Sequence, residues 1–319
     1  MNKTSMIHHF LSYPLGGVAV NVVLQIVVVL LFGIMFCHLG LLLSVGISVG
    51  YVGLVLLVHF SLSPYYNKRR HEDSRQEMLH SLRSHSLRAV VLTMLLVCVS
   101  QSLRCATLGL YFFDYVNSQT LMSWFSSWSD AVTQENVFTI GLIAFVAVGI
   151  VSQLVGAILF TQYVSLRFGK KATVTFCLVL TALLSLMAYM PQPDEIGLFC
   201  ILCVLKSLAF GAVAPLLWAM TGDVADQISH QHRVRATGFC YSSVTFALKA
   251  GLGLGGALGG LLLLAFGYLT ETDGVQSWTT VQGIRFITNV APALLFTLAI
   301  VALRPYSFYN TTFQPPRAT

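Results

Sequence analysis

The stretch from Trp218 to Tyr268 reads WAMTGDVADQISHQHRVRATGFCYSSVTFALKAGLGLGGALGGLLLLAFGY. Two apolar segments flank a short polar loop, and the second segment carries Lys249 inside an otherwise uncharged run. A run of this length can cross a bilayer as a helix, and an ionisable side chain at membrane depth marks a functional site by default. The stretch therefore predicts two membrane-spanning helices, the second with a functional lysine.

The composition of the whole chain indicates a polytopic membrane protein. Of its 319 residues, 56% are hydrophobic and only 9% are charged, which is too little polar surface for a water-soluble domain of this size. The net charge of +6 does not indicate a nucleic-acid partner, because the basic residues lie in loops between apolar runs. The lipid bilayer is the expected surrounding.

Eight apolar runs are long enough to cross a membrane. They do not alternate in polarity as the strands of a β-barrel would, so we expect helices. The predicted spans are residues 15–38, 41–63, 89–113, 138–163, 173–190, 196–221, 237–268 and 284–303. The expected fold class is all-α, a polytopic helical bundle of about eight transmembrane helices.

The loops divide the chain and predict its orientation. We expect a two-helix segment at 1–63, a basic loop at 64–88, a six-helix block at 89–305 and a tail at 306–319. Basic residues gather in every second loop, whereas the alternate loops carry acids. The positive-inside rule then predicts a multi-pass protein of the cell (inner or plasma) membrane with both termini in the cytoplasm.

One of the acidic loops has an amphipathic pattern. Apolar residues recur at helical spacing on one face of 118–136, and tryptophans occur near the end of the preceding span. This favours a helix in the outer membrane interface, and a disordered external loop is the alternative.

Lys249 is expected near the middle of the membrane. It lies eleven residues beyond Gly238, the expected cytoplasmic edge, or about 16 Å along a helix, against a hydrocarbon core about 30 Å thick. The residues predicted to share its helix face are Ser242, Thr245, Gly253 and Gly256. This polar stripe should face a cavity or a neighbouring helix, where Lys249 either binds substrate or forms a structural ion pair.

A glycine row lies roughly opposite this stripe. Gly251, Gly255 and Gly259 recur at every fourth position. Such rows allow two helix backbones to pack closely, and we expect close packing here.

Two other cations lie within predicted spans. Arg104 stands fifteen residues into its span, with Tyr111 seven residues further along the same face. A guanidinium at this depth needs a partner or water, so Arg104 either contacts substrate or a gate, or forms a structural pair. Lys206 lies about ten residues from the outer end of its span, and its side chain could extend outward to the interface.

The loop after the sixth span carries a group of four charges, Asp223, Asp226, Arg233 and Arg235. They lie at the cytoplasmic ends of two adjacent spans. Exposed charges usually form only a solvated loop, but acids and arginines across a helix hairpin could also form a cytoplasmic gate that breaks and re-forms.

Catalytic and metal-binding motifs do not occur in the sequence. It contains no HExxH, GxSxG, P-loop or dinucleotide motif, and no span interior holds an acid. Cys200 and Cys203 lack a second cysteine pair or a nearby histidine, which favours ordinary packing over a metal site. We therefore expect no enzyme, no metal and no cofactor.

Four further patterns occur in a fixed order along the chain. They are LYFFDYV at 110–116, RFGKK at 167–171, WAM-x-x-D-x-x-D at 218–226 with Arg235 following, and GIR at 283–285 before the last apolar run. In order and spacing they resemble motifs of the glycoside–pentoside–hexuronide:cation symporter family, within the major facilitator superfamily. The resemblance covers roughly residues 89–305.

The resemblance implies a twelve-helix fold whose two six-helix bundles rock around a central sugar site, with Na⁺ or H⁺ as the coupling cation. In melibiose-type carriers a lysine of the eleventh helix lies near the sugar and cation sites. The motif YSxxTxxxKxG places that lysine on Lys249 and its threonine on Thr245. In the family, a sugar-stacking tryptophan of the tenth helix lies one turn from the position that Trp218 occupies here, so the resemblance makes Trp218 a shifted equivalent of it.

The chain also departs from the family pattern. Residues 227–229 read QIS where the family loop has YGE, and Val244 replaces a glutamine of the melibiose carrier. The first two spans would correspond to helices five and six, so we expect a chain truncated by four helices. Those helices supply the acids that bind cation and sugar in the family.

Three functions follow as hypotheses. The preferred one is cation-coupled sugar symport by alternating access, with Lys249, Thr245, Ser242, Arg104, Trp218 and Tyr111 as substrate- or cation-binding residues. The second is a non-transporting remnant, or a subunit whose missing N-terminal helices come from another chain. The third is a lipid-handling carrier of the same superfamily.

Overall fold

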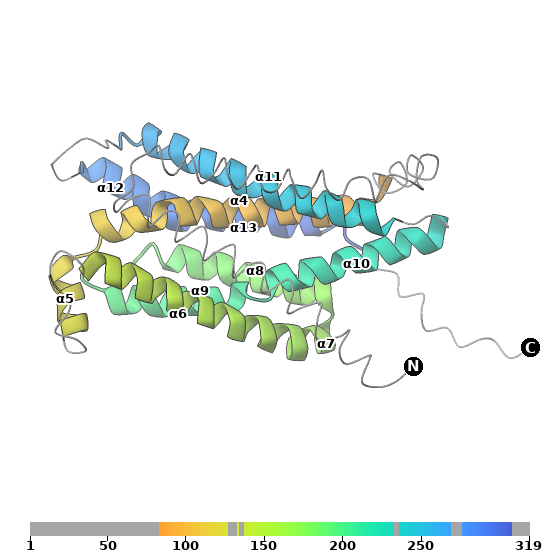
Figure 1. Cartoon of the computed structure of the whole chain (residues 1–319), viewed down its shortest axis with the longest axis horizontal. Helices are drawn as coiled ribbons and strands as arrows, with labels where there is room; N and C mark the ends of the chain where they lie inside the picture. Colours follow the sequence, from red (N-terminus) through yellow and green to blue (C-terminus); the bar gives the residue numbers. More distant parts are fainter. Residues whose placement is uncertain (1–82, 127–132, 134–136, 233–235, 269–275, 308–319) are drawn as a thin grey trace, which may run out of the picture. The chain divides into compact units, whose positions relative to one another are not determined.

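A computed structural model describes residues 83–126, 133, 137–232, 236–268 and 276–307. These residues belong to one compact unit, Ser81–Thr319 (Figure 1), and within them every regular element is a helix. The predicted spans 15–38 and 41–63 and most of the basic loop lie outside the described residues.

The helices of this unit follow the predicted order. They are α4 (His85–Asp114), α5 (Ser118–Ser126), α6 (Val137–Leu159), η2 (Phe160–Val164), α7 (Ser165–Phe168), α8 (Lys170–Met187), α9 (Ile196–Phe210), α10 (Val213–His232), α11 (Thr237–Ala265), α12 (Trp278–Arg285), η3 (Phe286–Val290) and α13 (Ala291–Leu303). Counting joined helices together, the described residues contain six segments long and apolar enough to cross a membrane. This confirms the helical bundle and the six spans predicted beyond residue 88.

The helix ends differ from the predicted ones by several residues. The span predicted at 173–190 runs from Lys170 to Met187, the span predicted at 237–268 ends at Ala265, and the span predicted at 284–303 begins at Trp278. Hydropathy detects only the apolar part of a helix, whereas its backbone hydrogen bonds continue into polar residues.

The span predicted at 196–221 is divided into two helices. α9 ends at Phe210, α10 begins at Val213, and α10 then continues to His232. Pro215 has no N–H group to donate to the carbonyl of Gly211, so the helical hydrogen bonding is interrupted at this point.

α4 is the central helix of one side of the bundle. α11 and α13 both pack along it, and Figure 1 shows the three helices running beside one another. Hydroxyl groups of α4 bond to the last span: Ser100 donates to the Pro292 carbonyl at 3.1 Å, and Thr288 donates to the Thr107 hydroxyl at 2.9 Å. In an apolar environment such bonds between helices replace the contacts that water would otherwise make.

The glycine row of α11 forms the contact with α4. Gly251, Gly255 and Gly259 are all buried, and a Cβ at Gly251 would lie 2.7 Å from the Leu95 carbonyl oxygen. Only glycine leaves room for backbones this close, which confirms the predicted close packing. The Ser102 hydroxyl adds a hydrogen bond of 2.7 Å to the Leu252 carbonyl of α11.

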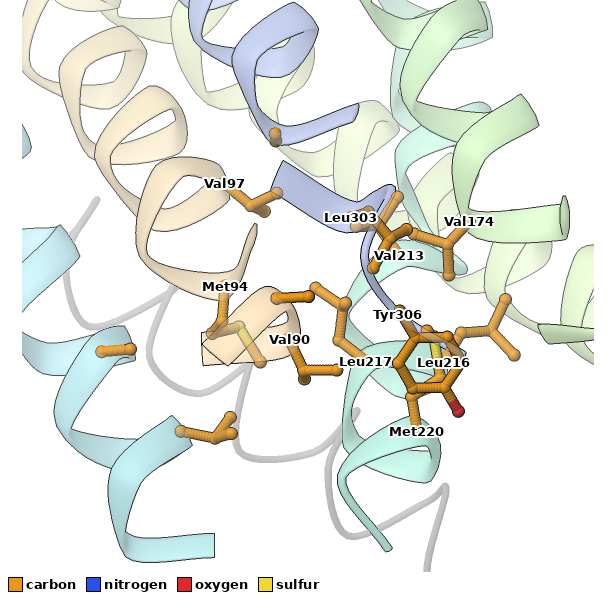
Figure 2. Close-up of a cluster of buried hydrophobic side chains, with 14 of the residues drawn as sticks. Val90, Met94, Val97, Val174, Val213, Leu216, Leu217, Met220, Leu303 and Tyr306 are labelled. Carbon is orange, nitrogen blue, oxygen red and sulfur yellow. The ribbon is translucent and has the colours of Figure 1, made fainter. Parts of the chain in front are cut away.

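A buried apolar cluster joins α4, α8, α10 and α13. Figure 2 shows side chains from these helices meeting, among them Val90, Met94, Val174, Leu217 and Leu303. The cluster lies beside the end of the bundle that contains Lys170, Asp223 and Tyr306, called here the Lys170 end.

The opposite end of the bundle, called here the Arg285 end, is held by a stacked arginine. The Arg285 guanidinium lies 4.5 Å from the ring centroid of Tyr115 and 4.6 Å from that of Tyr189. It also donates to the Tyr189 carbonyl at 2.6 Å. These contacts connect α12 to the ends of α4 and α8 through charge–π and hydrogen-bond interactions.

The amphipathic pattern at 118–136 is helical over Ser118–Ser126, and residues 127–132 and 134–136 lie outside the described residues. Leu121 is fully buried, and a Cβ at Gly197 would lie 2.9 Å from the Trp124 ring. α5 therefore packs on the beginnings of α6 and α9 rather than forming a disordered loop.

Candidate functional site

The polar stripe of α11 lies on the surface of the described unit. Lys249, Ser242 and Gly253 are exposed, and Thr245 is half-buried among them. The glycine row on the other side of the helix is buried against α4. Within the part of the chain that the structure describes, Lys249 forms no ion pair. Its ammonium group therefore has three donors available for a ligand.

Two hydroxyl groups beside Lys249 bond to their own helix. Thr245 donates to the Tyr241 carbonyl at 2.8 Å, and Ser242 donates to the Phe239 carbonyl at 3.0 Å. With their hydrogens used in this way, both oxygens retain lone pairs that can accept hydrogen bonds from a ligand.

Trp218 joins this group from the neighbouring helix. Its ring on α10 stacks on Tyr241 of α11, with centroids 5.9 Å apart and planes 12° from parallel. Tyr241 is also the residue that accepts the Thr245 hydroxyl. The structure thus brings Trp218 to the same stretch of α11 as Ser242, Thr245 and Lys249; we call these four residues the α11 site.

Arg104 is oriented toward α9 instead of α11. Its Nη2 donates to the Cys203 sulfur at 3.6 Å, and its Nε is buried without a partner among the described residues. Lys206 follows Cys203 by one turn and is only 3% exposed. The prediction that Lys206 could extend outward is therefore wrong, because helix packing encloses its ammonium group.

Tyr111 lies within an aromatic core. It is 2% exposed and stacks on Phe199 with centroids 4.7 Å apart, and Tyr115 lies 5.0 Å away. In this conformation its ring supports the packing of α4 against α9 and is separate from the α11 site.

At the Lys170 end, Asp223 pairs with a residue of the RFGKK turn. The Lys170 ammonium lies 2.6 and 2.7 Å from the two carboxylate oxygens of Asp223. Asp226 is exposed, and Arg233 and Arg235 lie outside the described residues. One acid of the predicted gate is thus held by a lysine at the start of α8.

Lys171 binds the end of the last helix. Its ammonium donates to the carbonyls of Arg304 at 2.8 Å and Tyr306 at 2.6 Å, just beyond α13. Free carbonyls at a helix C-terminus attract cations, whereas the N-terminus of α8 disfavours them. Gly169, with φ of +82°, allows the turn that places both lysines there. Burial, with a further contribution from Asp223, raises the pKa of Tyr306 beside this group.

The chain matches the sequence profile of a family described as MFS/sugar transport protein over residues 5–310. It belongs to this family.

Three curated relatives illustrate the family. The inner membrane symporter YicJ of Escherichia coli is 34% identical over 130 residues, which are 40% of this chain and 28% of YicJ. An uncharacterized symporter, YnaJ of Bacillus subtilis, is 25% identical over 142 residues, or 44% of this chain and 30% of YnaJ. The isoprimeverose transporter of Lactiplantibacillus pentosus is 28% identical over 151 residues, or 47% and 31%. The matched segments span about a third of each relative.

The sequence motifs did not predict two features of the site. Lys170 was identified only as part of a motif, although its position in RFGKK is a signal that could have suggested a partner for Asp223. The burial of Lys206 has no local signal, because it depends on how α9 packs against α4, α6 and α8.

Proposed function

We propose that this family member takes part in cation-coupled sugar transport across the inner or plasma membrane, by alternating access. The α11 site carries the proposal, because it combines a lysine with no ion pair among the described residues, two hydroxyl acceptors and a half-buried aromatic stack along one stretch of α11. A symporter and a sugar transporter among its relatives support the same activity.

In this proposal each residue of the α11 site contacts the sugar differently. The Lys249 ammonium donates hydrogen bonds to sugar hydroxyls, which in turn donate to the oxygens of Thr245 and Ser242. Trp218, supported by Tyr241, offers an apolar ring for the C–H face of the sugar. Arg104 and Tyr111, which the structure places elsewhere, would act on this site only through helix movement.

The coupling cation, Na⁺ or H⁺, requires a carboxylate that the predicted spans do not contain. The first acid of the sequence is Glu72. Of the described acids, Asp114 ends α4, and Asp223 and Asp226 lie in the part of α10 beyond the predicted span 196–221. We infer that acids outside these spans, for instance on a second chain that supplies N-terminal helices, complete the cation site.

The Lys170 end would act as the cytoplasmic gate. An ion pair that is partly exposed, with side chains 39% and 21% accessible, contributes little to stability. It can therefore break and re-form as α8 and α10 separate. Both termini would lie on this side of the membrane, as the basic loops indicate.

Uptake measurements test the α11 site. The full chain is expressed in cells that lack sugar uptake, with and without a six-helix partner chain, and accumulation of radiolabelled glycosides is followed. We expect Lys249→Ala to lower uptake about tenfold or more, equivalent to about 1.4 kcal/mol of lost interaction. Leu254→Ala is the matched control, because Leu254 is an exposed apolar residue of the same helix.

The same uptake measurements distinguish the three hypotheses. Uptake that is unchanged in Lys249→Ala would refute the α11 site. Uptake that requires the partner chain would identify a subunit of a divided transporter. Labelled lysolipid that accumulates in place of sugar would favour the lipid-handling carrier.

A further inference from the structure

The ring of Tyr241 holds the indole of Trp218 from the neighbouring helix. The two rings are 12° from parallel, with their centroids 5.9 Å apart. Trp218 lies on α10 and Tyr241 on α11, and both residues are half-buried. Stacked aromatic rings attract each other in addition to the effect of burying their surfaces. The stack therefore limits the rotamers that the indole can adopt.

A gap in α10 beside Trp218 accommodates the far end of the tyrosine. Gly222 follows Trp218 by four residues, so the two share one face of α10. A Cβ at Gly222 would lie 3.0 Å from the Tyr241 hydroxyl oxygen, the one atom of the described neighbouring helices within 4 Å of that position. The missing side chain of Gly222 thus leaves the space in which the tyrosine lies flat against the indole.

The stack is aligned with the ligand groups of α11. Tyr241, Thr245 and Lys249 follow one another at intervals of four residues along one side of the helix. Tyr241 and Lys249 are about 12 Å apart along the helix axis. Long helical side chains lean toward the N-terminus, which brings the lysine toward the tyrosine. The indole of Trp218 therefore lies at one end of the α11 site and Lys249 at the other.

We propose that Tyr241 is the positioning residue for Trp218, and that Gly222 makes this position possible. The inference rests on the proposed transport function and concerns how the α11 site binds its sugar. An indole that rotates freely must be ordered each time a sugar binds, and this ordering weakens the affinity. An indole already held against Tyr241 meets the C–H face of the sugar without that loss.

The concentration dependence of uptake tests the positioning role. Tyr241→Ala removes the stacked ring but keeps the backbone carbonyl that accepts the Thr245 hydroxyl. We expect it to raise the KM for radiolabelled methyl glycosides about threefold or more, and to change the maximal rate by less than about twofold. Tyr241→Phe keeps the ring and should keep the KM. Phe246→Ala is the matched control, because Phe246 is an aromatic residue of the same helix that is 71% exposed.

A substitution at Gly222 tests the space that the tyrosine occupies. In Gly222→Ala the added methyl group would press on the Tyr241 hydroxyl and tilt the ring. We expect a KM between that of the unmodified chain and that of Tyr241→Ala. The double variant Gly222→Ala/Tyr241→Phe lacks the oxygen that the methyl group contacts, so its KM should return to that of the unmodified chain. An effect of alanine on α10 alone would persist in the double variant.

Tryptophan fluorescence reports on the indole without any transport step. The chain has four tryptophans, and the substitutions Trp124→Phe, Trp128→Phe and Trp278→Phe leave only Trp218. In the purified full chain in detergent, Tyr241→Ala should increase the quenching of Trp218 by acrylamide, whereas Tyr241→Phe should leave it unchanged. Methyl glucoside, methyl galactoside and methyl xyloside are the sugar probes. At least one of them should reduce the quenching in the chain that retains Tyr241.

Other results would overturn the inference. A KM that is unchanged in Tyr241→Ala, or a maximal rate that falls alone, would show that the ring only supports helix packing. Failure of the double variant to restore the KM would refute the role of Gly222. Trp218 fluorescence that none of the three glycosides changes would place the sugar elsewhere. Glycoside-dependent fluorescence in a chain that shows no uptake, with or without a partner chain, would support the positioning of Trp218 and refute the transport function alone.

Discussion

At the scale of single residues, the lysines and arginines of the described helices differ in their partners. Lys170 has a carboxylate, Lys171 has helix-end carbonyls and Arg285 has two aromatic rings. Lys249 and Lys206 have none of these among the described residues. Stabilising partners are the usual condition for a cation within a membrane protein, so these two are exceptions, and Lys249, which is exposed, is the candidate for a ligand contact.

The Lys170–Asp223 pair should show a small coupling energy. A double-mutant cycle with Lys170→Met and Asp223→Asn, measured by unfolding in detergent, should give about 0.5–1 kcal/mol, because both side chains are partly accessible to water. Asp226→Asn is the matched control, since Asp226 is exposed on the same helix. The effects of Asp226→Asn and Lys170→Met on the free energy of unfolding should therefore be additive. A coupling above about 2 kcal/mol would contradict a gate that opens readily.

At the scale of helices, close backbone contact determines where the bundle is rigid. The α4–α11 contact depends on the buried glycine row. The backbones of α6 and α9 also come close together. A Cβ at Gly211, the residue after α9, would lie 2.7 Å from the Ala157 nitrogen of α6. Other residues at these positions would separate the helices.

A methyl group at Gly255 should destabilise the bundle. In Gly255→Ala the added carbon would lie 2.7 Å from the Ser102 Cβ and closer still to the Val99 carbonyl oxygen. We expect a loss of about 1–3 kcal/mol in the free energy of unfolding. Gly260→Ala is the control, because nothing lies within 4 Å of a Cβ there, and it should change stability by less than about 1 kcal/mol. Equal effects of the two changes would show that α4 and α11 are not in close contact.

At the scale of the whole molecule, the six spans place two differently built ends on opposite sides of a membrane. The Lys170 end contains the lysines of the RFGKK turn and the end of α13. The Arg285 end contains the tyrosines that enclose Arg285, together with α5.

The orientation can be tested by labelling. Ser307 and Trp278 are both exposed, near the Lys170 end and the Arg285 end respectively. In cells whose native cysteines have been blocked or replaced, a membrane-impermeant maleimide should modify Trp278→Cys from outside. It should reach Ser307→Cys only in inverted vesicles. The reverse pattern would place the termini outside the cell.

The features that depend on local pattern follow from the amino-acid sequence alone. Apolar runs of sufficient length identified the six described spans, because a bilayer imposes the same length on every helix that crosses it. The four-residue spacing of Gly251, Gly255 and Gly259 identified the packing face of α11, and four short motifs indicated the family.

Contacts between residues distant in the sequence depend on how the helices pack. Asp223 bonds to Lys170, 53 positions away, and Arg104 reaches Cys203, 99 positions away. Lys206 and Lys249 are both lysines within apolar helices, yet one is buried and the other is exposed. Helical periodicity assigns a residue to a face, but the neighbouring helices determine whether that face is enclosed, since burial is a property of the packed bundle.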